Sequence, residues 1–270
     1  MSKLIYIHSI LLLIIMAMIS SCDSSSVDEK KAKDKLAYDY YKDGRIKTET
    51  EIKDGKAHGL MKHYSPQGTL KSVYTYNSGK KAGPAVIYYP NGVLREKRNY
   101  EQGYRHGLSK MYYRSGELYR ESPYHMGKLE GIRKSYYKDG TLMATAPYKH
   151  GFPGLELKEY NSSGELLENK PRIAINPVDR LAFENKYILE LRLIPAQAGT
   201  IFYIGDLKDG KYIHQELFPI EPENGNAEFI MRLDKGEFRM ETLTISAQYK
   251  TDKSNYGVVS RKYNLAIDNK

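Results

Sequence analysis

The chain has 270 residues, of which 40% are hydrophobic and 28% charged, and its formal net charge is +9. The length allows one large domain or two ordinary ones, and the composition describes a soluble chain apart from roughly the first twenty residues, which excludes a protein built mainly of membrane-spanning segments. The 25 Tyr beside six Phe and no Trp favour β-structure with wide amphipathic surfaces over a helical core.

The first predicted element is a secretory signal in the sequence MSKLIYIHSILLLIIMAMISSC. Its uninterrupted apolar run, Ile10 to Ile19, is shorter than the roughly 20 residues that a spanning helix needs. The residues ISSC, which end at Cys22, resemble the lipobox of bacterial lipoproteins, in which the cysteine becomes the lipidated first residue of the mature protein. We therefore predict a lipoprotein signal peptide over residues 1–21 and lipidation of Cys22. An uncleaved membrane anchor and a cleaved signal without lipid remain as alternatives.

The only cysteine of the chain is Cys22, so the sequence predicts an exported protein without disulfides. Residues 22–39 are Ser-rich and then charged, which is typical of a flexible tether. The predicted location is the bacterial cell envelope, with the lipid in the outer membrane and the protein on its periplasmic or surface face. The sequence leaves open which membrane and which side carry the protein.

A 24-residue repeat organises residues 40–166. A tyrosine precedes each marker glycine by four residues and an aliphatic residue follows it by two. A second glycine follows the first five markers by eleven residues, at Gly55, Gly79, Gly103, Gly127 and Gly151. The marker glycines are Gly44, Gly68, Gly92, Gly116, Gly140 and Gly164. A third glycine stands at Gly59, Gly83, Gly107 and Gly131, but the last copy has Leu155 there, beside a displaced Gly154. We predict five repeats and a partial sixth, the last copy being atypical because it ends the array.

Each repeat is predicted to form a β-hairpin. Positions two apart alternate in character from Leu94 to Tyr100, which is typical of a strand, and Gly103 supplies a tight turn that needs a positive φ. The chain then returns and turns again at the next marker glycine. Pro123 and Pro147 occupy equivalent places in the outgoing strand, where a missing N–H donor predicts a bulge or a strand end.

This pattern of Tyr, Gly and aliphatic residues resembles the MORN-type repeat, in the variant found in the YwqK-like antitoxin family. The resemblance implies an elongated, single-layer, twisted sheet of hairpins, and in that family a protein-binding role. The lipoprotein signal and the following domain depart from a cytoplasmic antitoxin.

Basic charge concentrates in the array, since residues 40–160 hold 22 Lys and Arg against 12 Asp and Glu. Because strands lie about 4.8 Å apart, equivalent lysines on the return strands should repeat about every 9.6 Å along one face, beside a ladder of tyrosines. The candidate binding ridge consists of Lys62, Lys110, Lys134 and Lys158 with Tyr64, Tyr88, Tyr112 and Tyr136. A further basic set, Arg95, Lys97, Arg98 and Arg105, lies in the third repeat.

The ridge suits an acidic protein surface, an anionic polysaccharide or anionic lipid head groups. The alternative is that these lysines only keep a one-layer sheet soluble and discourage edge pairing. Nucleic acid is not an expected partner, because an exported, lipid-anchored protein rarely meets it.

No enzymatic site is predicted. The chain has no GxSxG, HExxH or P-loop motif. His58 and His106 occupy one slot two repeats apart, about 19 Å from each other, which is too far for a shared metal ion. We therefore expect no catalytic residue, no metal site and no cofactor.

The period stops after Leu166. Residues 167–176 are predicted to form a linker, and residues 177–270 an immunoglobulin-like β-sandwich of six or seven strands, with a small barrel as the alternative. The predicted strands are YILELRLIP, TIFYIG, KYIHQELF, AEFIMRL, TLTISAQY and GVVSRKYNLAI. The resulting interpretation is an all-β, lipid-anchored scaffold that presents its repeats to a protein partner; an immunity lipoprotein and a binder of anionic lipid or polysaccharide are the alternatives.

Overall fold

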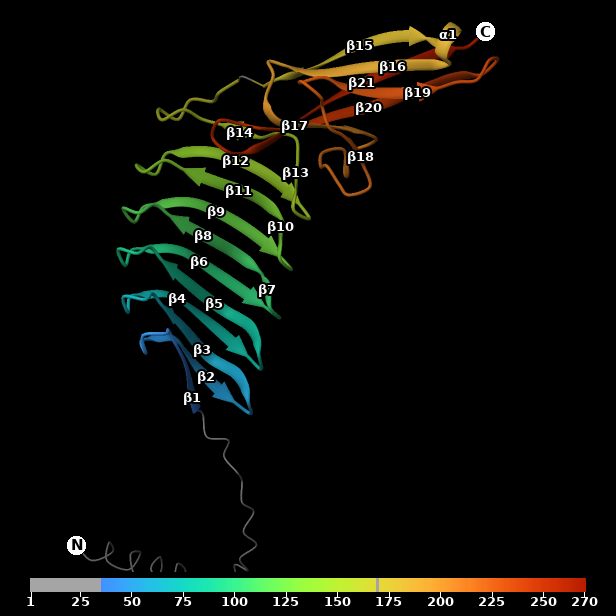
Figure 1. Ribbon diagram of the computed structural model, residues 1–270. Helices are drawn as coiled ribbons and strands as arrows, with labels where there is room; N and C mark the ends of the chain where they lie inside the picture. The colour runs from blue at the N-terminus through green and yellow to red at the C-terminus, as the bar shows by residue number, and fades with distance from the viewer. Residues whose placement is uncertain (1–34, 169) are drawn as a thin grey trace, which may run out of the picture. The chain divides into compact units, whose positions relative to one another are not determined.

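The structure, a computed structural model, describes residues 35–168 and 170–270 (Figure 1). The predicted signal peptide, Cys22 and most of the predicted tether lie outside these residues. Within them, nearly all regular secondary structure is β-strand, and the single helix is the four-residue α1, Leu181–Glu184. The predicted all-β fold class is therefore confirmed.

The repeats form one antiparallel sheet of fourteen strands, in which neighbours in sequence are neighbours in space (Figure 1). The strands are β1 Lys35–Tyr40, β2 Ile46–Lys53, β3 Lys56–Tyr64, β4 Leu70–Asn77, β5 Lys80–Tyr88, β6 Leu94–Glu101, β7 Tyr104–Arg105, β8 Gly107–Tyr112, β9 Leu118–His125, β10 Lys128–Leu129, β11 Gly131–Tyr136, β12 Leu142–Lys149, β13 Phe152–Pro153 and β14 Lys158–Glu159. Strand β1 pairs with β2 from Lys35 onward, so the sheet begins inside the segment predicted as tether.

The hairpin turns at the second glycines have two consecutive residues with positive φ. In the third repeat Gln102 has φ 50° and Gly103 has φ 92°. Two central residues with positive φ define a type I′ turn, whose twist matches that of the flanking strands. The predicted need for a positive φ at Gly103 is thus met.

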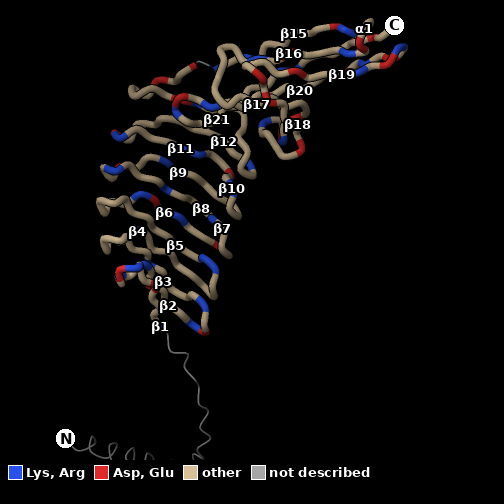
Figure 2. Tube along the Cα trace, in the orientation of Figure 1, with Lys and Arg blue, Asp and Glu red and all other residues tan. Residues whose placement is uncertain are grey.

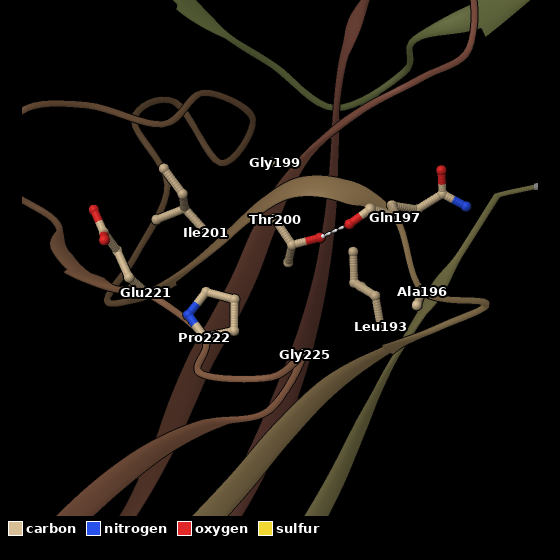
Figure 3. A pocket seen from close by; sticks show the side chains of 9 residues that line it. All are labelled: Leu193, Ala196, Gln197, Gly199, Thr200, Ile201, Glu221, Pro222 and Gly225. Atoms are coloured by element: carbon tan, nitrogen blue, oxygen red, sulfur yellow. Dashed lines mark hydrogen bonds between the residues drawn. The ribbon is translucent and has the colours of Figure 1, made fainter.

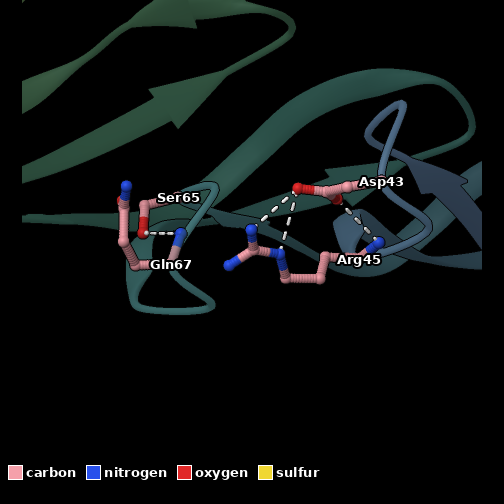
Figure 4. A network of polar contacts seen from close by, with 4 residues as sticks. All are labelled: Asp43, Arg45, Ser65 and Gln67. Atoms are coloured by element: carbon pink, nitrogen blue, oxygen red, sulfur yellow. Dashed lines mark hydrogen bonds and ion pairs between the residues drawn. The ribbon is translucent and has the colours of Figure 1, made fainter.

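The turns at the marker glycines are held by short polar side chains (Figure 4). The Asp43 carboxylate accepts the backbone N–H of Arg45 at 3.1 Å and the Arg45 guanidinium at 2.8 Å. In the next copy the Ser65 hydroxyl accepts the N–H of Gln67 at 3.2 Å. Side chains that accept a backbone N–H two residues on mimic a turn, which is why Asp, Asn and Ser recur at these turns.

The pairing of the return strand with the preceding outgoing strand shifts in register beside each third glycine. In the fourth repeat β10 and β11 both pair with β9, but their registers differ by two residues. Pro123 lies at this interruption and its carbonyl accepts the N–H of Glu130 at 3.0 Å, while Pro147 accepts that of Gly154 at 3.0 Å. Each proline therefore lacks its backbone N–H at a place where the strand pairing is already interrupted, in agreement with the predicted bulge.

The two faces of the array sheet differ in burial. One face, here the inner face, alternates small and aromatic side chains that are buried, among them Thr48, Ser72, Ala85, Ser135 and Tyr148. No second layer of described strands covers this face, so the side chains are shielded mainly by one another. The opposite face, here the outer face, carries the predicted lysines.

A second tyrosine links consecutive repeats. The Tyr113 hydroxyl donates to the carbonyl oxygen of Tyr136 at 2.7 Å, and Tyr41, Tyr89 and Tyr137 make the equivalent bond one repeat ahead. In the remaining copy Ser65 stands in the place of this tyrosine. The bond therefore stabilises the stacking of repeats without being required in every copy.

Replacing Tyr113 by Phe should lower the free energy of unfolding by about 1 kcal/mol, because one hydrogen bond is lost while the ring remains. Denaturant unfolding of the full chain measures the change. Tyr104→Phe is the control, since Tyr104 is exposed at a hairpin tip. Equal losses in both variants would contradict a specific role for the Tyr113 hydroxyl.

The C-terminal region is a two-sheet sandwich, as predicted. One sheet has the order β15-β16-β19 and the other β18-β17-β20-β21. Leu189 and Leu191 of the first sheet pack with Phe202 and Ile245 of the second, and all four are fully buried. The strands are β15 Arg172–Arg180, β16 Lys186–Ile194, β17 Ala198–Ile204, β18 Phe218–Ile220, β19 Ala227–Arg232, β20 Phe238–Lys250 and β21 Tyr256–Asp268.

Two expectations for this region differ from the structure. Strand β15 occupies Arg172–Arg180, so part of the predicted linker belongs to the sandwich; it pairs with β16 alone, and an edge strand tolerates Pro177. The segment KYIHQELF, residues 211–218, was predicted to be a strand but is irregular over most of its length. Its apolar residues Ile213 and Leu217 are buried against Phe152 and Leu155 at the end of the array instead.

That irregular segment joins the array to the sandwich. Tyr212 bridges to Gly154, the Leu155 N–H donates to the Lys211 carbonyl at 2.9 Å, and the Ile213 N–H donates to the Pro153 carbonyl. A Cβ on Gly154 would lie 2.7 Å from Cδ1 of Tyr212. The displaced glycine of the last repeat is thus explained by close contact with the sandwich.

Candidate binding surfaces of the array

The predicted lysines lie in one row across the outer face. Cross-strand pairing connects the positions in the order Glu49, Lys62, Val73, Val86, Lys97, Lys110, Glu121, Lys134, Thr145 and Lys158. We call this set the outer row. The four predicted tyrosines are two residues further along the same return strands and lie beside the row.

Glutamates in the outer row neutralise two of the lysines. Lys62 Nζ lies 2.8 Å from a Glu49 oxygen, and Lys110 Nζ lies 2.9 Å from a Glu121 oxygen. The hydroxyl of Tyr136 also donates to Glu121, at 2.9 Å. Hydrogen bonding to Lys110 is the main cause of the lowered pKa of Glu121, which keeps this carboxylate charged. Tyr64 makes the corresponding, longer contact with Glu49.

The remaining lysines of the outer row, Lys97, Lys134 and Lys158, are exposed and form no ion pair with any described residue. Lys97, from the further basic set, lies directly opposite Lys110. The sequence placed Lys97 outside the ridge because it is on an outgoing strand and the other ridge lysines are on return strands.

Exposed apolar side chains accompany the lysines. Leu60, Leu108 and Ile132 occupy one repeat position, two residues before a ridge lysine, and are 39%, 48% and 56% exposed. Residues two apart on a strand share a face, so the outer face combines ammonium groups with an apolar edge. Such a mixture is suited to a partner that buries apolar area and carries negative charge.

The inner face holds a second basic group that the sequence did not indicate as a site. Arg98, Arg105, Arg120 and Arg133 lie on strands of this face, and the buried carboxylate of Glu96 lies beside the first two. We call these five residues the inner arginine cluster. Glu96 is 5% exposed and pairs with Arg98 at 2.5 Å and Arg105 at 3.5 Å. Burial opposes the charge on Arg98, but hydrogen bonds to Glu96 and Tyr100 outweigh it and raise the pKa.

The other two arginines of the cluster are held by neutral groups. Arg120 Nε donates to the Ser135 hydroxyl at 3.0 Å, and Arg133 Nη2 donates to the Asn255 side-chain oxygen at 3.0 Å. The Arg133 guanidinium also lies 4.8 Å from the ring centroid of Tyr148. Burial lowers the pKa of Arg133, and the Arg120 charge adds to this effect. Among the described residues no carboxylate pairs directly with either guanidinium; the nearest one to Arg133 in the hydrogen-bond network is Glu159, which accepts from the Nδ2 of the same Asn255 at 2.6 Å.

Four segments of the array match one repeat family, described as the MORN repeat variant, over residues 57–78, 81–102, 105–126 and 129–150. Their starts are 24 residues apart, in the period of the hairpins. The chain contains four MORN repeats. MORN repeats suggest a role in binding a membrane or a protein. No curated protein matches the chain significantly.

Lys and Arg positions lie along the MORN array from its first hairpin to its last (Figure 2). His106, predicted as a turn residue, lies beside a hairpin tip, its ring 5.1 Å from that of His125. Over the part of the chain that the structure describes, no three His, Cys, Asp or Glu side chains are grouped so that they could hold a metal ion. Within residues 35–168 and 170–270, no helix has the length and hydropathy to cross a membrane.

Outside the MORN array, a pocket of about 440 Å³ opens in the sandwich between the β16–β17 connection and residues 221–225 (Figure 3). Its lining is small or apolar except for Gln197, Thr200 and Glu221, and the Thr200 hydroxyl donates to the Gln197 carbonyl at 2.7 Å. Glu221 is the one charged side chain of this lining. The charged surfaces with repeated geometry are therefore those of the MORN array.

Proposed function

We propose that the chain is a lipid-anchored scaffold protein of the bacterial cell envelope, and that its MORN array binds a protein partner. The observation that carries this proposal is the outer face, where three lysines of the outer row and three apolar side chains are exposed over several repeats: Lys97, Lys134 and Lys158 with Leu60, Leu108 and Ile132. The apolar side chains of a partner would cover the exposed apolar residues of the outer face, and its acidic side chains would pair with Lys97, Lys134 and Lys158. The sandwich at the end of the array adds a second surface for assembly.

A photo-reactive amino acid in place of Leu108, expressed in intact cells, tests the protein partner. We expect a reproducible covalent adduct, identified by mass spectrometry, that is reduced when Lys97 and Lys134 are replaced by Glu. The same probe at Phe183, which is exposed on α1 of the sandwich, is the control. Failure to recover any reproducible adduct from Leu108 would refute a partner on the outer face. Recovery of a toxin would assign the chain to the immunity proteins of the YwqK-like type.

The envelope part of the proposal depends on lipidation of Cys22, which the lipobox-like residues support. Cys22→Ser should shift the protein from the membrane fraction to the soluble fraction or leave an unprocessed precursor of higher mass. Retention in the membrane at unchanged mass would refute the lipid anchor.

Anionic lipid or polysaccharide is a second candidate ligand, because Lys97, Lys134 and Lys158 are not neutralised by described neighbours. Binding through such exposed charges must weaken as salt rises, since the screening length is about 8 Å at physiological ionic strength. Residues 23–270, without the predicted signal and lipid, should then sediment with phosphatidylglycerol vesicles in low salt and remain in solution in high salt. Equal sedimentation with neutral vesicles would refute this candidate.

A further inference from the structure

The inner arginine cluster is the strongest unexplained feature of the structure. Buried charges in proteins are normally paired with opposite charges. Here Glu96 pairs with Arg98 and Arg105, whereas Arg120 and Arg133 have only neutral hydrogen-bond acceptors among the described residues. Burial of Nε of Arg98 and Nε of Arg133 without any acceptor adds to the imbalance.

The cluster is not a feature of the repeat itself. The positions of Arg98 and Arg133 are occupied in the last repeat by Ala146 and Leu157, which are buried. The repeat fold is therefore compatible with neutral side chains at both places. Arginine there costs desolvation free energy, and folding of the sheet does not require it.

The geometry matches a row of carboxylates. Arg120 lies on β9 and pairs with Ser135 on β11, two residues from Arg133 on the same face. Diagonal neighbours of this kind are about 7–8 Å apart. An extended peptide advances about 3.3 Å per residue, so side chains two residues apart on one of its faces span about 7 Å.

The cluster is preorganised for that recognition. The guanidinium of Arg105 lies 5.2 Å from the ring centroid of Tyr124 and its Nη1 donates to the Tyr124 hydroxyl at 3.2 Å. Planar guanidinium groups match carboxylates in two parallel hydrogen bonds, and aromatic neighbours fix their orientation. The ammonium groups of the outer row lack this planar, bidentate geometry.

We propose that the inner arginine cluster binds an acidic polypeptide segment, whose Asp or Glu carboxylates supply the negative charge that Arg120 and Arg133 lack. This site is on the face opposite the outer row and goes beyond the proposed function. A negative result for this site would leave the proposed function of the outer face unchanged, and the reverse also holds.

Fluorescence anisotropy of a labelled poly-glutamate peptide, with the full-length chain in detergent, tests the proposal. We expect saturable binding by the wild type and about tenfold weaker binding for Arg120→Gln or Arg133→Gln, because each loses a charged hydrogen-bonding group. Lys134→Gln separates the two faces, since Lys134 is adjacent to Arg133 on the same strand but on the outer face, and Lys80→Gln, exposed at a hairpin tip, is the matched control. A poly-serine peptide should not bind.

Arg133→Lys keeps the positive charge but loses the two parallel N–H donors of the guanidinium. This variant should bind poly-glutamate more weakly than the wild type and more tightly than Arg133→Gln. It replaces Arg133→Gln in the experiment if circular dichroism shows that Arg133→Gln does not fold. Absence of saturable poly-glutamate binding overturns the proposal. The proposal is also overturned if Lys134→Gln loses as much affinity for poly-glutamate as the arginine variants do. That result would assign peptide binding to the outer face and leave the proposed function intact.

Discussion

Replacing Glu96 by alanine should lower the free energy of unfolding by about 3–5 kcal/mol. Glu96 is 5% exposed and is the one carboxylate of the inner arginine cluster, within 2.5 Å of Arg98 and 3.5 Å of Arg105. Its removal leaves both guanidinium groups, whose side chains are 17% and 28% exposed, without their counter-charge. Denaturant unfolding at neutral pH, followed by circular dichroism, measures the change.

The chain itself offers the controls for this result. Glu101→Ala removes a carboxylate from the same strand that is 57% exposed, and its effect should be within about 1 kcal/mol. In the last repeat Ala144 and Ala146 occupy the positions of Glu96 and Arg98. The double variant with alanine at both positions removes the charge with its partner and should be more stable than Glu96→Ala alone. If the double variant were the less stable of the two, the unpaired-charge explanation would be wrong.

Replacing Gly154 by alanine should lower the free energy of unfolding by about 1–3 kcal/mol, as overpacking does. The added Cβ would lie 2.7 Å from Cδ1 of Tyr212 and 3.3 Å from the Lys211 carbonyl oxygen. Either the tyrosine ring or the backbone pairing around Leu155 has to shift. Limited proteolysis within residues 206–217 should become faster, since this segment is held by the contact that is lost.

A double-mutant cycle with Tyr212→Ala identifies the cause. If the clash with the tyrosine ring dominates, Gly154→Ala should lower the free energy of unfolding only slightly in a chain that already carries Tyr212→Ala. The difference from its effect in the wild type is the coupling energy between the two sites. Additive costs would show that the backbone at Gly154, and not the ring, limits the substitution.

The hairpins of the array could be predicted because the sequence period of 24 residues is also the period of the structure. Each repeat of 24 residues makes two passes of the sheet, so the glycine spacing indicates where the chain turns, and alternation from Leu94 to Tyr100 indicates a strand. A type I′ turn at Gly103 follows from local chemistry alone. The period could not show that the sheet begins at Lys35, because β1 is a single strand without the glycine pattern.

The predicted linker and one predicted strand of the sandwich were wrong for opposite reasons. Prolines beside the alternating Ile173 and Ile175 suggested a linker, although an edge strand accepts them. Residues 211–218 alternate like a strand, yet Ile213 and Leu217 are apolar because they cover the last repeat. The conformation of residues 211–218 thus depends on their contact with the last repeat, which the local sequence pattern does not show.

The two surfaces of the array differ in how far the sequence indicated them. The lysines of the outer row recur at one repeat position, so their common face followed from strand parity. Arg120 and Arg133 occupy different repeat positions and come together only through pairing of neighbouring strands. The available signal was an arginine at positions that are uncharged in most other copies. The position of Arg120 holds Thr48, Ser72 and Ala144, with Glu96 as the exception, and that of Arg133 holds Met61, Ala85, Ser109 and Leu157.

The uniform length of the repeats also constrains how this chain can change by insertion or deletion. Removing a whole repeat would shorten the sheet by two strands, about 9.6 Å, while every remaining residue keeps its face. A loss of one residue within a strand would instead exchange the inner and outer faces beyond it. Gene duplication and unequal crossing-over can therefore change the number of repeats in whole units and still leave the Gly154 junction with the sandwich intact, whereas small frame-preserving indels inside strands should be strongly selected against.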